Sequence, residues 1–226
     1  MLKTLFKPSL PQVVELDGIS FSIKYAQRAN MKRIIMRLSA KNELRLSASR
    51  LSKKQVNAFI LENKTWVLQQ HGSFKDIYAQ GASFYYLNEK FSIEHHSSAL
   101  CFKDKSVYLH PTKAKLQCDN FYKTQAKAYL PERVQFWQEK MDLYATELGF
   151  RLAKRRWGSC NAKGKISLNP YMMKLSFEMI DYIIIHELSH LKHLNHSKEF
   201  YQCIQDYMPR FKEVEKEIKA LSLKLH

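Results

Sequence analysis

Residues 183–190 read Ile183-Ile184-Ile185-His186-Glu187-Leu188-Ser189-His190, and this stretch is the most informative part of the sequence. Its apolar first half predicts a helix with a buried start, and Ser176 is a suitable N-cap for that helix. His186 and His190 are four residues apart, so both imidazoles lie on one helical face. Both can therefore reach one metal ion at about 2.0–2.1 Å, with Glu187 beside it, which is the H-E-x-x-H pattern.

A third ligand is expected further along the chain, because a catalytic zinc site uses three protein ligands. His193 lies on the same helical face as His186, but seven residues correspond to about 10 Å of rise, which is too far for one ion. His196 can reach the ion if the chain turns back, and Asn195 suits such a turn before Ser197 caps a new helix. We therefore predict His196. The alternative is a glutamate from the following helices, namely Glu199, Glu213, Glu215 or Glu217.

These residues predict one zinc ion per chain, held by His186, His190 and His196, with the fourth position open to water. Zinc lowers the pKa of its water from about 15.7 toward about 7, and Glu187 is expected to act as the general base. A three-histidine site also accepts manganese, nickel or cobalt. The sequence offers three candidates for a second group that stabilises the developing oxyanion: Arg156, Tyr171 and His193.

The first half of the chain has the patterns of strands and hairpins. Alternating apolar residues begin at Ile19, and residues 32–38 and 43–49 flank a hairpin turn. The capping box at Ser52 predicts a helix over about 52–71. Two further hairpins are expected, one from strands 84–87 and 91–94, and the other from strands 100–103 and 107–109.

From about Asn120 the sequence is typical of helices. Residues 121–130 and 132–148 are rich in helix formers, and Pro131 between them either kinks one helix or begins a second. A β-like stretch at 150–155 and a strand at 165–168 precede the helix that carries the histidines. Two more helices follow, one from Ser197 and a last amphipathic one with Phe211, Val214, Ile218 and Leu221.

The predicted fold class is α+β, with two regions. Residues 1–119 form a basic antiparallel β region with one helix, and residues 120–226 form a helical catalytic domain with a small sheet. The formal net charge is +16, and residues 1–75 hold 14 Lys and Arg against 4 Asp and Glu. Such a basic region attracts polyanions, so contact with nucleic acid or another polyanion is one interpretation and an ordinary solvated surface is the other.

The remaining composition predicts a cytoplasmic protein without a membrane anchor. No apolar run approaches the roughly 20 residues of a membrane-spanning helix, and the N-terminus lacks the apolar stretch of a signal peptide. The four cysteines, Cys101, Cys118, Cys160 and Cys203, are widely spaced. This spacing argues against a disulfide framework or a thiolate zinc site and suits a reducing compartment.

Four segments together resemble the YgjP-like metallopeptidases, a family of bacterial predicted metal-dependent hydrolases of the zincin type that is more distantly related to SprT-like proteases. They are R-W-G-S-C at 156–160, G-x-I-x-L-N at 164–169, the H-E-L-S-H helix at 180–191 and N-H-S at 195–197. The departures are Ser176, where Pro is expected, and Tyr201, where Trp is usual.

The resemblance implies a zincin-like catalytic domain in which His186, His190, His196 and Glu187 occupy the matching positions. It also implies an edge strand over the metal, for which Lys165–Leu168 is the candidate, and an extended peptide can pair with such a strand.

The sequence is compatible with three functions. The first is a zinc metallopeptidase that acts on a peptide or protein. The second is a metal-dependent nucleoside triphosphate pyrophosphatase, which the basic composition favours, although a Walker A loop is absent. The third is a nucleic-acid-associated protein with a structural metal, against which the open three-ligand site with its adjacent Glu187 argues.

Overall fold

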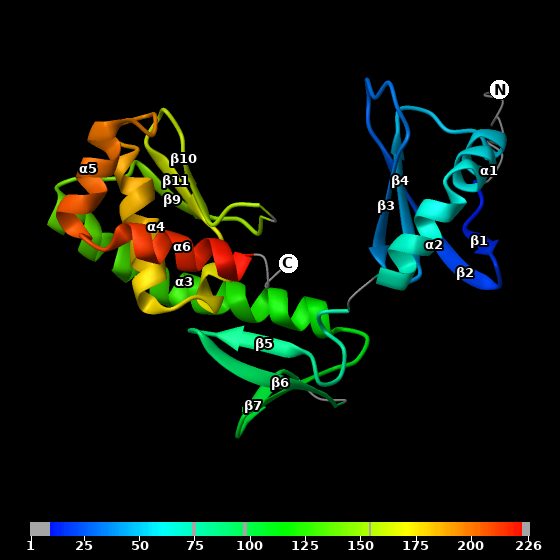
Figure 1. Cartoon of the computed structure of the whole chain (residues 1–226), viewed down its shortest axis with the longest axis horizontal. Helices are drawn as coiled ribbons and strands as arrows, with labels where there is room; N and C mark the ends of the chain where they lie inside the picture. Colours follow the sequence, from blue (N-terminus) through cyan, green and yellow to red (C-terminus); the bar gives the residue numbers. More distant parts are fainter. Residues whose placement is uncertain (1–9, 74–75, 97–98, 154, 223–226) are drawn as a thin grey trace, which may run out of the picture. The chain divides into compact units, whose positions relative to one another are not determined.

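The computed structural model of the chain describes residues 10–73, 76–96, 99–153 and 155–222. The chain divides into two compact units, Met1–Ile77 and Tyr78–His226, which are described separately (Figure 1). Both units combine helices with small sheets, which confirms the α+β class. Among the described residues, no helix combines the length and the apolarity that crossing a membrane requires.

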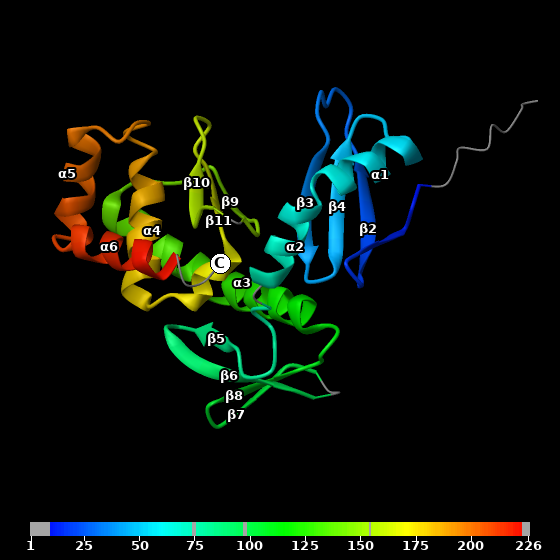
Figure 2. The ribbon, with the colours of Figure 1, turned by 45° about the vertical axis from the view of Figure 1, so that its right-hand side comes forward.

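The first unit is a four-stranded sheet with helices against one of its faces. The strand order is β1-β2-β4-β3. Phe21, Ile23, Leu44 and Leu46 are buried on one face and form a core with apolar residues of the two helices. Figure 2 shows the two helices beside the sheet. The elements are β1 (Val13–Leu16), β2 (Ile19–Gln27), β3 (Ile35–Ala40), β4 (Glu43–Ala48), α1 (Lys53–Glu62) and α2 (Lys64–Ser73).

Two predictions for this unit are wrong in part. The β3–β4 hairpin is present, but β2 and β4 run parallel, so the sheet is mixed and not purely antiparallel. The segment 28–34 carries the chain to the outer edge, and β4 then returns between β2 and β3. The helix expected over 52–71 is two helices, because Asn63 ends α1 and its side-chain amide donates to the Phe59 carbonyl at 2.8 Å. The Ser52 capping box is confirmed.

The second unit contains two further sheets and the remaining helices. The sheets have the orders β5-β6-β8-β7 and β10-β11-β9. The strands are β5 (Ser83–Tyr86), β6 (Glu89–His95), β7 (Cys101–Lys103), β8 (Ser106–Leu109), β9 (Glu147–Phe150), β10 (Gly158–Cys160) and β11 (Lys165–Leu168). The helices are α3 (Ala114–Met141), the 3₁₀ helix η1 (Pro170–Lys174), α4 (Phe177–Ser189), α5 (Lys198–Tyr207) and α6 (Phe211–Ser222).

One core joins the β5–β8 sheet to α3. The Tyr122 ring of α3 stacks on Phe84 at 5.2 Å between centroids, and its hydroxyl donates to the Tyr85 carbonyl at 2.5 Å. The region boundary expected from the sequence, between residues 119 and 120, lies inside α3. The two compact units divide instead between Ile77 and Tyr78. The change from strand-like to helix-like sequence does not coincide with a change of core.

The long helix α3 agrees with one of the two alternatives at Pro131, a single helix, but it begins at Ala114, before the predicted 121, and it ends earlier than predicted. Pro131 lies inside one continuous helix. The helix ends at Asp142, whose left-handed conformation (φ 52°) stops it before the predicted Leu148. The chain then forms β9 at 147–150, so the β-like stretch begins before the predicted 150–155. Both hairpins predicted upstream of α3 are confirmed.

Candidate metal centre

Helix α4 is almost wholly buried and holds the first histidine. The Ser176 hydroxyl caps it by accepting from the Met179 amide at 3.3 Å, as predicted. Apolar side chains cover most of the helix, and an ion pair fixes it to α3, since Arg133 donates to both carboxylate oxygens of Asp181 at 2.5 Å. The helix ends at Ser189, and His190 follows as its C-cap.

The three predicted histidines converge. One ring nitrogen of each of His186, His190 and His196 lies within 4.8 Å of the other two. The Nε2 atoms of His186 and His196 are 3.3 Å apart. Two ligands at about 2.05 Å from one tetrahedral ion are separated by about 3.3 Å, so this pair has the spacing of zinc ligands.

The turn after α4 brings His196 to the other two rings. His196 immediately precedes Ser197, which caps α5 by accepting from the Phe200 amide at 3.4 Å. The buried Phe200 ring lies 4.6–5.0 Å from the three imidazole centroids and supports all of them. The rival Glu199 binds the Ser197 hydroxyl at 2.6 Å instead. Among the described residues, none of the four glutamates joins the histidine cluster.

The donor set suits a metal ion chemically as well as geometrically. Burial lowers the pKa of His186 to about 4 and also lowers the pKa of His190, so both are neutral at pH 7, the form that binds a metal. His190 Nδ1 lies 3.1 Å from the carbonyl oxygen of His193, which leaves Nε2 for a ligand bond. His193 thus contributes its backbone. His186 Nδ1 is buried without a hydrogen-bond partner in the described part of the chain.

Glu187 lies buried beside strand β10. Burial raises the pKa of its carboxyl to about 7, against the opposing effects of the Arg156 charge and a hydrogen bond from the Cys160 amide. A Cβ atom at Gly158 would be 2.6 Å from Glu187 Oε1 and 2.7 Å from its Cγ. Any larger residue at position 158 would therefore force the Glu187 side chain to shift.

Comparison with known proteins identifies the family. The family model of the YgjP-like metallopeptidase domain matches residues 32–221. The chain belongs to this family. It is therefore a metal-dependent, peptidase-like hydrolase. Comparison with curated proteins gave no match.

Two archaeal crystal structures share similarity with part of the chain. The metallopeptidase zymogen abylysin of Pyrococcus abyssi is 28% identical, with a TM-score of 0.37, over 40% of this chain and 91% of its own. The metallopeptidase zymogen jannalysin of Methanocaldococcus jannaschii is 24% identical, with a TM-score of 0.37, over 40% of this chain and 93% of its own.

Sequence reasoning missed the roles of two residues in this YgjP-like chain. Gly158 makes room for Glu187, and Asn169 holds the segment before β10. The buried Asn169 side chain donates to the carbonyls of Ala153 (2.7 Å) and Arg156 (3.0 Å) and accepts from the Tyr171 amide (3.1 Å). Gly158 lies in the R-W-G-S-C segment and Asn169 in the G-x-I-x-L-N segment. Membership of these two segments is the sequence feature that points to both residues.

The strand expected at the sheet edge is not the one the sequence indicated. β11 (Lys165–Leu168) lies in the middle of the three-stranded sheet, between β10 and β9. The strand at the edge beside Glu187 is β10 (Gly158–Cys160). The prediction is wrong because β10 pairs antiparallel with β11. β10, and not β11, is therefore the edge strand next to Glu187 of α4.

The three candidates for stabilising an oxyanion have different surroundings in the structure. Tyr171 donates its hydroxyl to Asp119 of α3 and packs edge-on against Tyr122. His193 is engaged through its backbone at His190. Arg156 is exposed and is the one of the three whose charge acts on Glu187 in this YgjP-like site.

Proposed function

We propose that the chain is a zinc-dependent metallopeptidase in which His186, His190 and His196 hold the metal and Glu187 is the general base. The observation that carries the proposal is the convergence of three imidazoles, two of them neutral through burial, next to a buried carboxylate. When bound, zinc supplies a Lewis acid that polarises the substrate carbonyl and acidifies water.

Glu187 has the properties of a base that works near neutral pH. With its carboxyl pKa raised to about 7, it accepts a proton readily and can return it to the leaving nitrogen. The Cys160 amide orients the carboxylate, and the missing side chain at Gly158 leaves it room. The positive charge of Arg156 opposes protonation of Glu187, and it is the candidate among the three for stabilising an oxyanion.

The edge position of β10 favours a peptide substrate. Its outer edge is not paired with another strand in the described part of the chain. An extended peptide that adds to this edge is held by backbone hydrogen bonds and passes the Glu187 carboxylate. This is the physical reason to place peptide hydrolysis ahead of the alternatives.

A nucleotide substrate is the second candidate, and a specific observation favours it. Arg151, Arg155 and Arg156 are exposed in the segment that leads into β10, and the charge of Arg156 reaches Glu187. Three guanidinium groups in one short segment suit phosphate groups. Metal-dependent release of pyrophosphate from nucleoside triphosphates, lost in Glu187→Gln, would establish this function in place of peptide cleavage.

The first experiment measures metal content by elemental mass spectrometry. We expect about one zinc ion per wild-type chain and clear loss in His196→Ala. His193→Ala is the matched control, because that histidine contributes only its carbonyl to the cluster, and it should retain the metal. Full retention in His196→Ala would remove His196 as a ligand.

The second experiment separates the functions. Glu187→Gln should retain zinc and lose hydrolysis of a mixed peptide library. If the variant keeps every activity of the wild type, the metal is structural and the peptidase proposal is wrong.

We also propose a cytoplasmic location. All four cysteines are free thiols in the structure, and the pKa of the buried Cys118 thiol is raised to about 12 by burial, so this thiol stays protonated and unreactive. Free thiols suit a reducing compartment. Localisation of a tagged chain by cell fractionation tests this.

A further inference from the structure

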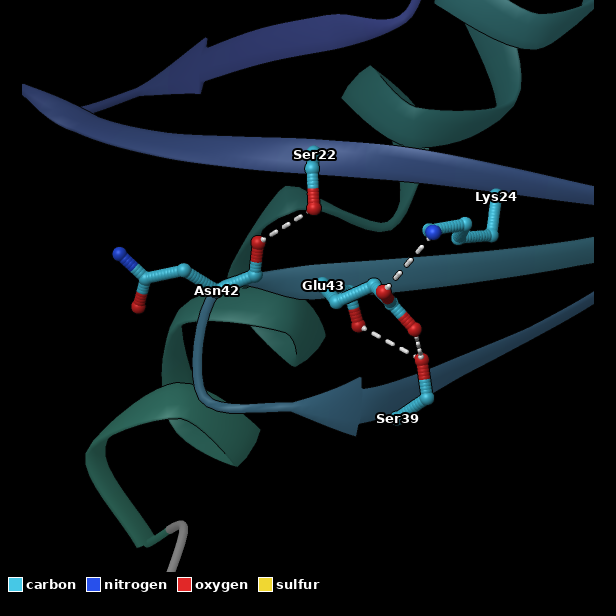
Figure 3. Close-up of polar contacts among 5 residues, drawn as sticks. All are labelled: Ser22, Lys24, Ser39, Asn42 and Glu43. Carbon is cyan, nitrogen blue, oxygen red and sulfur yellow. Dashed lines mark hydrogen bonds and ion pairs between the residues drawn. The ribbon is translucent and has the colours of Figure 1, made fainter. Parts of the chain in front are cut away.

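The first unit has one sheet face that the helices do not cover. Phe21, Ile23, Leu44 and Leu46 point toward α1 and α2, so the alternate residues of the same strands point to the opposite face. On β2, β4 and β3 these outward residues include Lys24, Arg45 and Arg37. All three are exposed. Figure 3 shows part of this face, with Lys24 and its neighbours.

Strand register places these three cations in one line across the sheet. Lys24 of β2 pairs with Arg45 of β4, and Arg45 pairs with Arg37 of β3. Directly opposed residues on one face of a sheet lie about 5 Å apart, and like charges in such pairs are unfavourable. We call Lys24, Arg45 and Arg37 the cationic row. Repulsion between these like charges destabilises the sheet, and a bound anion would reduce that repulsion.

The acidic residues of this face neutralise only one member of the row, Lys24. Glu43 accepts from the Ser39 hydroxyl at 2.6 Å and lies 3.8 Å from Lys24 Nζ, as Figure 3 shows. Glu15 of β1 pairs with Ser20, at the opposite end of β2 from Gln27. Within the described residues, Arg37 and Arg45 form no ion pair.

More cations extend the row at one end of the sheet. They lie where β2 and β4 finish and β3 begins, and the Arg28 amide donates to the Ala48 carbonyl at 3.0 Å, which joins the strand ends there. All of them are exposed: Arg28, Lys32, Arg33 and Arg50. The positive charge therefore continues from the row to this end of the unit, away from Glu15.

We infer that this face binds the phosphodiester backbone of nucleic acid without reading its sequence. Long arginine and lysine side chains in a line can each contact a phosphate of one nucleic-acid strand, and arginine binds a phosphate through two donors at once. Base stacking does not contribute, because the described outward residues of β2, β3 and β4 include no aromatic side chain. The inference needs neither metal nor hydrolysis and stands apart from the proposed function.

The test is binding of the full chain to a fluorescent 20-base-pair DNA duplex, measured by anisotropy over a range of salt concentrations. The variant Arg37→Gln/Arg45→Gln should bind on the order of tenfold more weakly at low salt. Its plot of log affinity against log salt should be shallower by about 1.8, since each phosphate contact contributes about 0.9. Arg37→Lys/Arg45→Lys keeps the charges and should retain most of the slope.

The matched control is Lys53→Gln/Lys54→Gln, which removes two exposed charges from α1 on the helical side of the same unit. We expect it to bind as the wild type does. Equal weakening in the control would mean that net charge alone drives binding, and the inference would fail. It fails also if the wild type does not bind the duplex, if the arginine variant binds unchanged, or if the chain binds only vesicles containing phosphatidylserine.

Discussion

At the scale of single residues, Gly158 decides the space around the Glu187 carboxylate. Its missing side chain lets β10 pass within contact distance of the glutamate, and the Cys160 amide two residues later binds the same group. A general base acts only when its carboxylate is held in place, so one strand supplies both the room and the orientation.

Gly158→Ala should abolish most of the peptide hydrolysis while zinc content stays near that of the wild type. The new Cβ would lie 2.6 Å from Glu187 Oε1, so the carboxylate must move, and misplacement by about 1 Å costs on the order of 100-fold in rate. Gly149→Ala is the control in the same sheet, since its Cβ would meet no heavy atom nearer than 3.8 Å. Unchanged turnover in Gly158→Ala would refute the role of this contact.

Asn169→Ala should destabilise the second unit by about 1–3 kcal/mol, because three partly buried backbone groups lose their partner. It should also lower activity, since the segment held by Asn169 carries Arg156 and leads into β10. Chemical denaturation and turnover together check this. If the variant is less stable but its folded fraction keeps full activity, the Asn169 hydrogen bonds stabilise the fold and do not affect catalysis.

At the scale of elements, local patterns were predicted well and long-range pairings were not. The α4 helix, its Ser176 cap and the turn that returns His196 follow from neighbours within a few residues of one another, and all are present. The parallel pairing of β2 with β4 depends on which strand edge the β3–β4 hairpin meets. No local pattern of side chains encodes that choice.

The same limit explains the misplaced edge strand. Lys165–Leu168 has the apolar alternation of a buried strand, and Ile166 and Leu168 are indeed buried. A central strand and an edge strand that faces a helix share this pattern. Only the pairing of β10 with β11 decides which of them borders Glu187.

Helix α3 gives a test at this scale. Pro131 is exposed and lies inside the helix, where it removes one backbone hydrogen bond. Pro131→Ala should raise the free energy of unfolding by about 1–2 kcal/mol, since the restored bond outweighs the added freedom of the unfolded chain. Urea denaturation measures this. Lower stability in the variant would mean that the proline ring itself stabilises α3.

At the scale of the whole chain, the two units have separate cores. The core of the first unit is built from residues between Leu10 and Leu68, and that of the second from residues between Tyr78 and Leu221. The candidate metal centre lies in the second unit and the cationic row in the first. Changes in one core should therefore leave the chemistry of the other unit intact.

Leu46→Ala and Leu168→Ala form a matched pair for this test, because each leucine is fully buried, one in each core. Each substitution should lower the stability of its own unit by about 2–5 kcal/mol. Calorimetry should then show that Leu46→Ala shifts only the transition of the first unit and leaves zinc content unchanged. Leu168→Ala should weaken zinc retention on heating, since β11 supports β10 beside Glu187. Loss of zinc in Leu46→Ala would show that the first unit is needed to hold the metal centre.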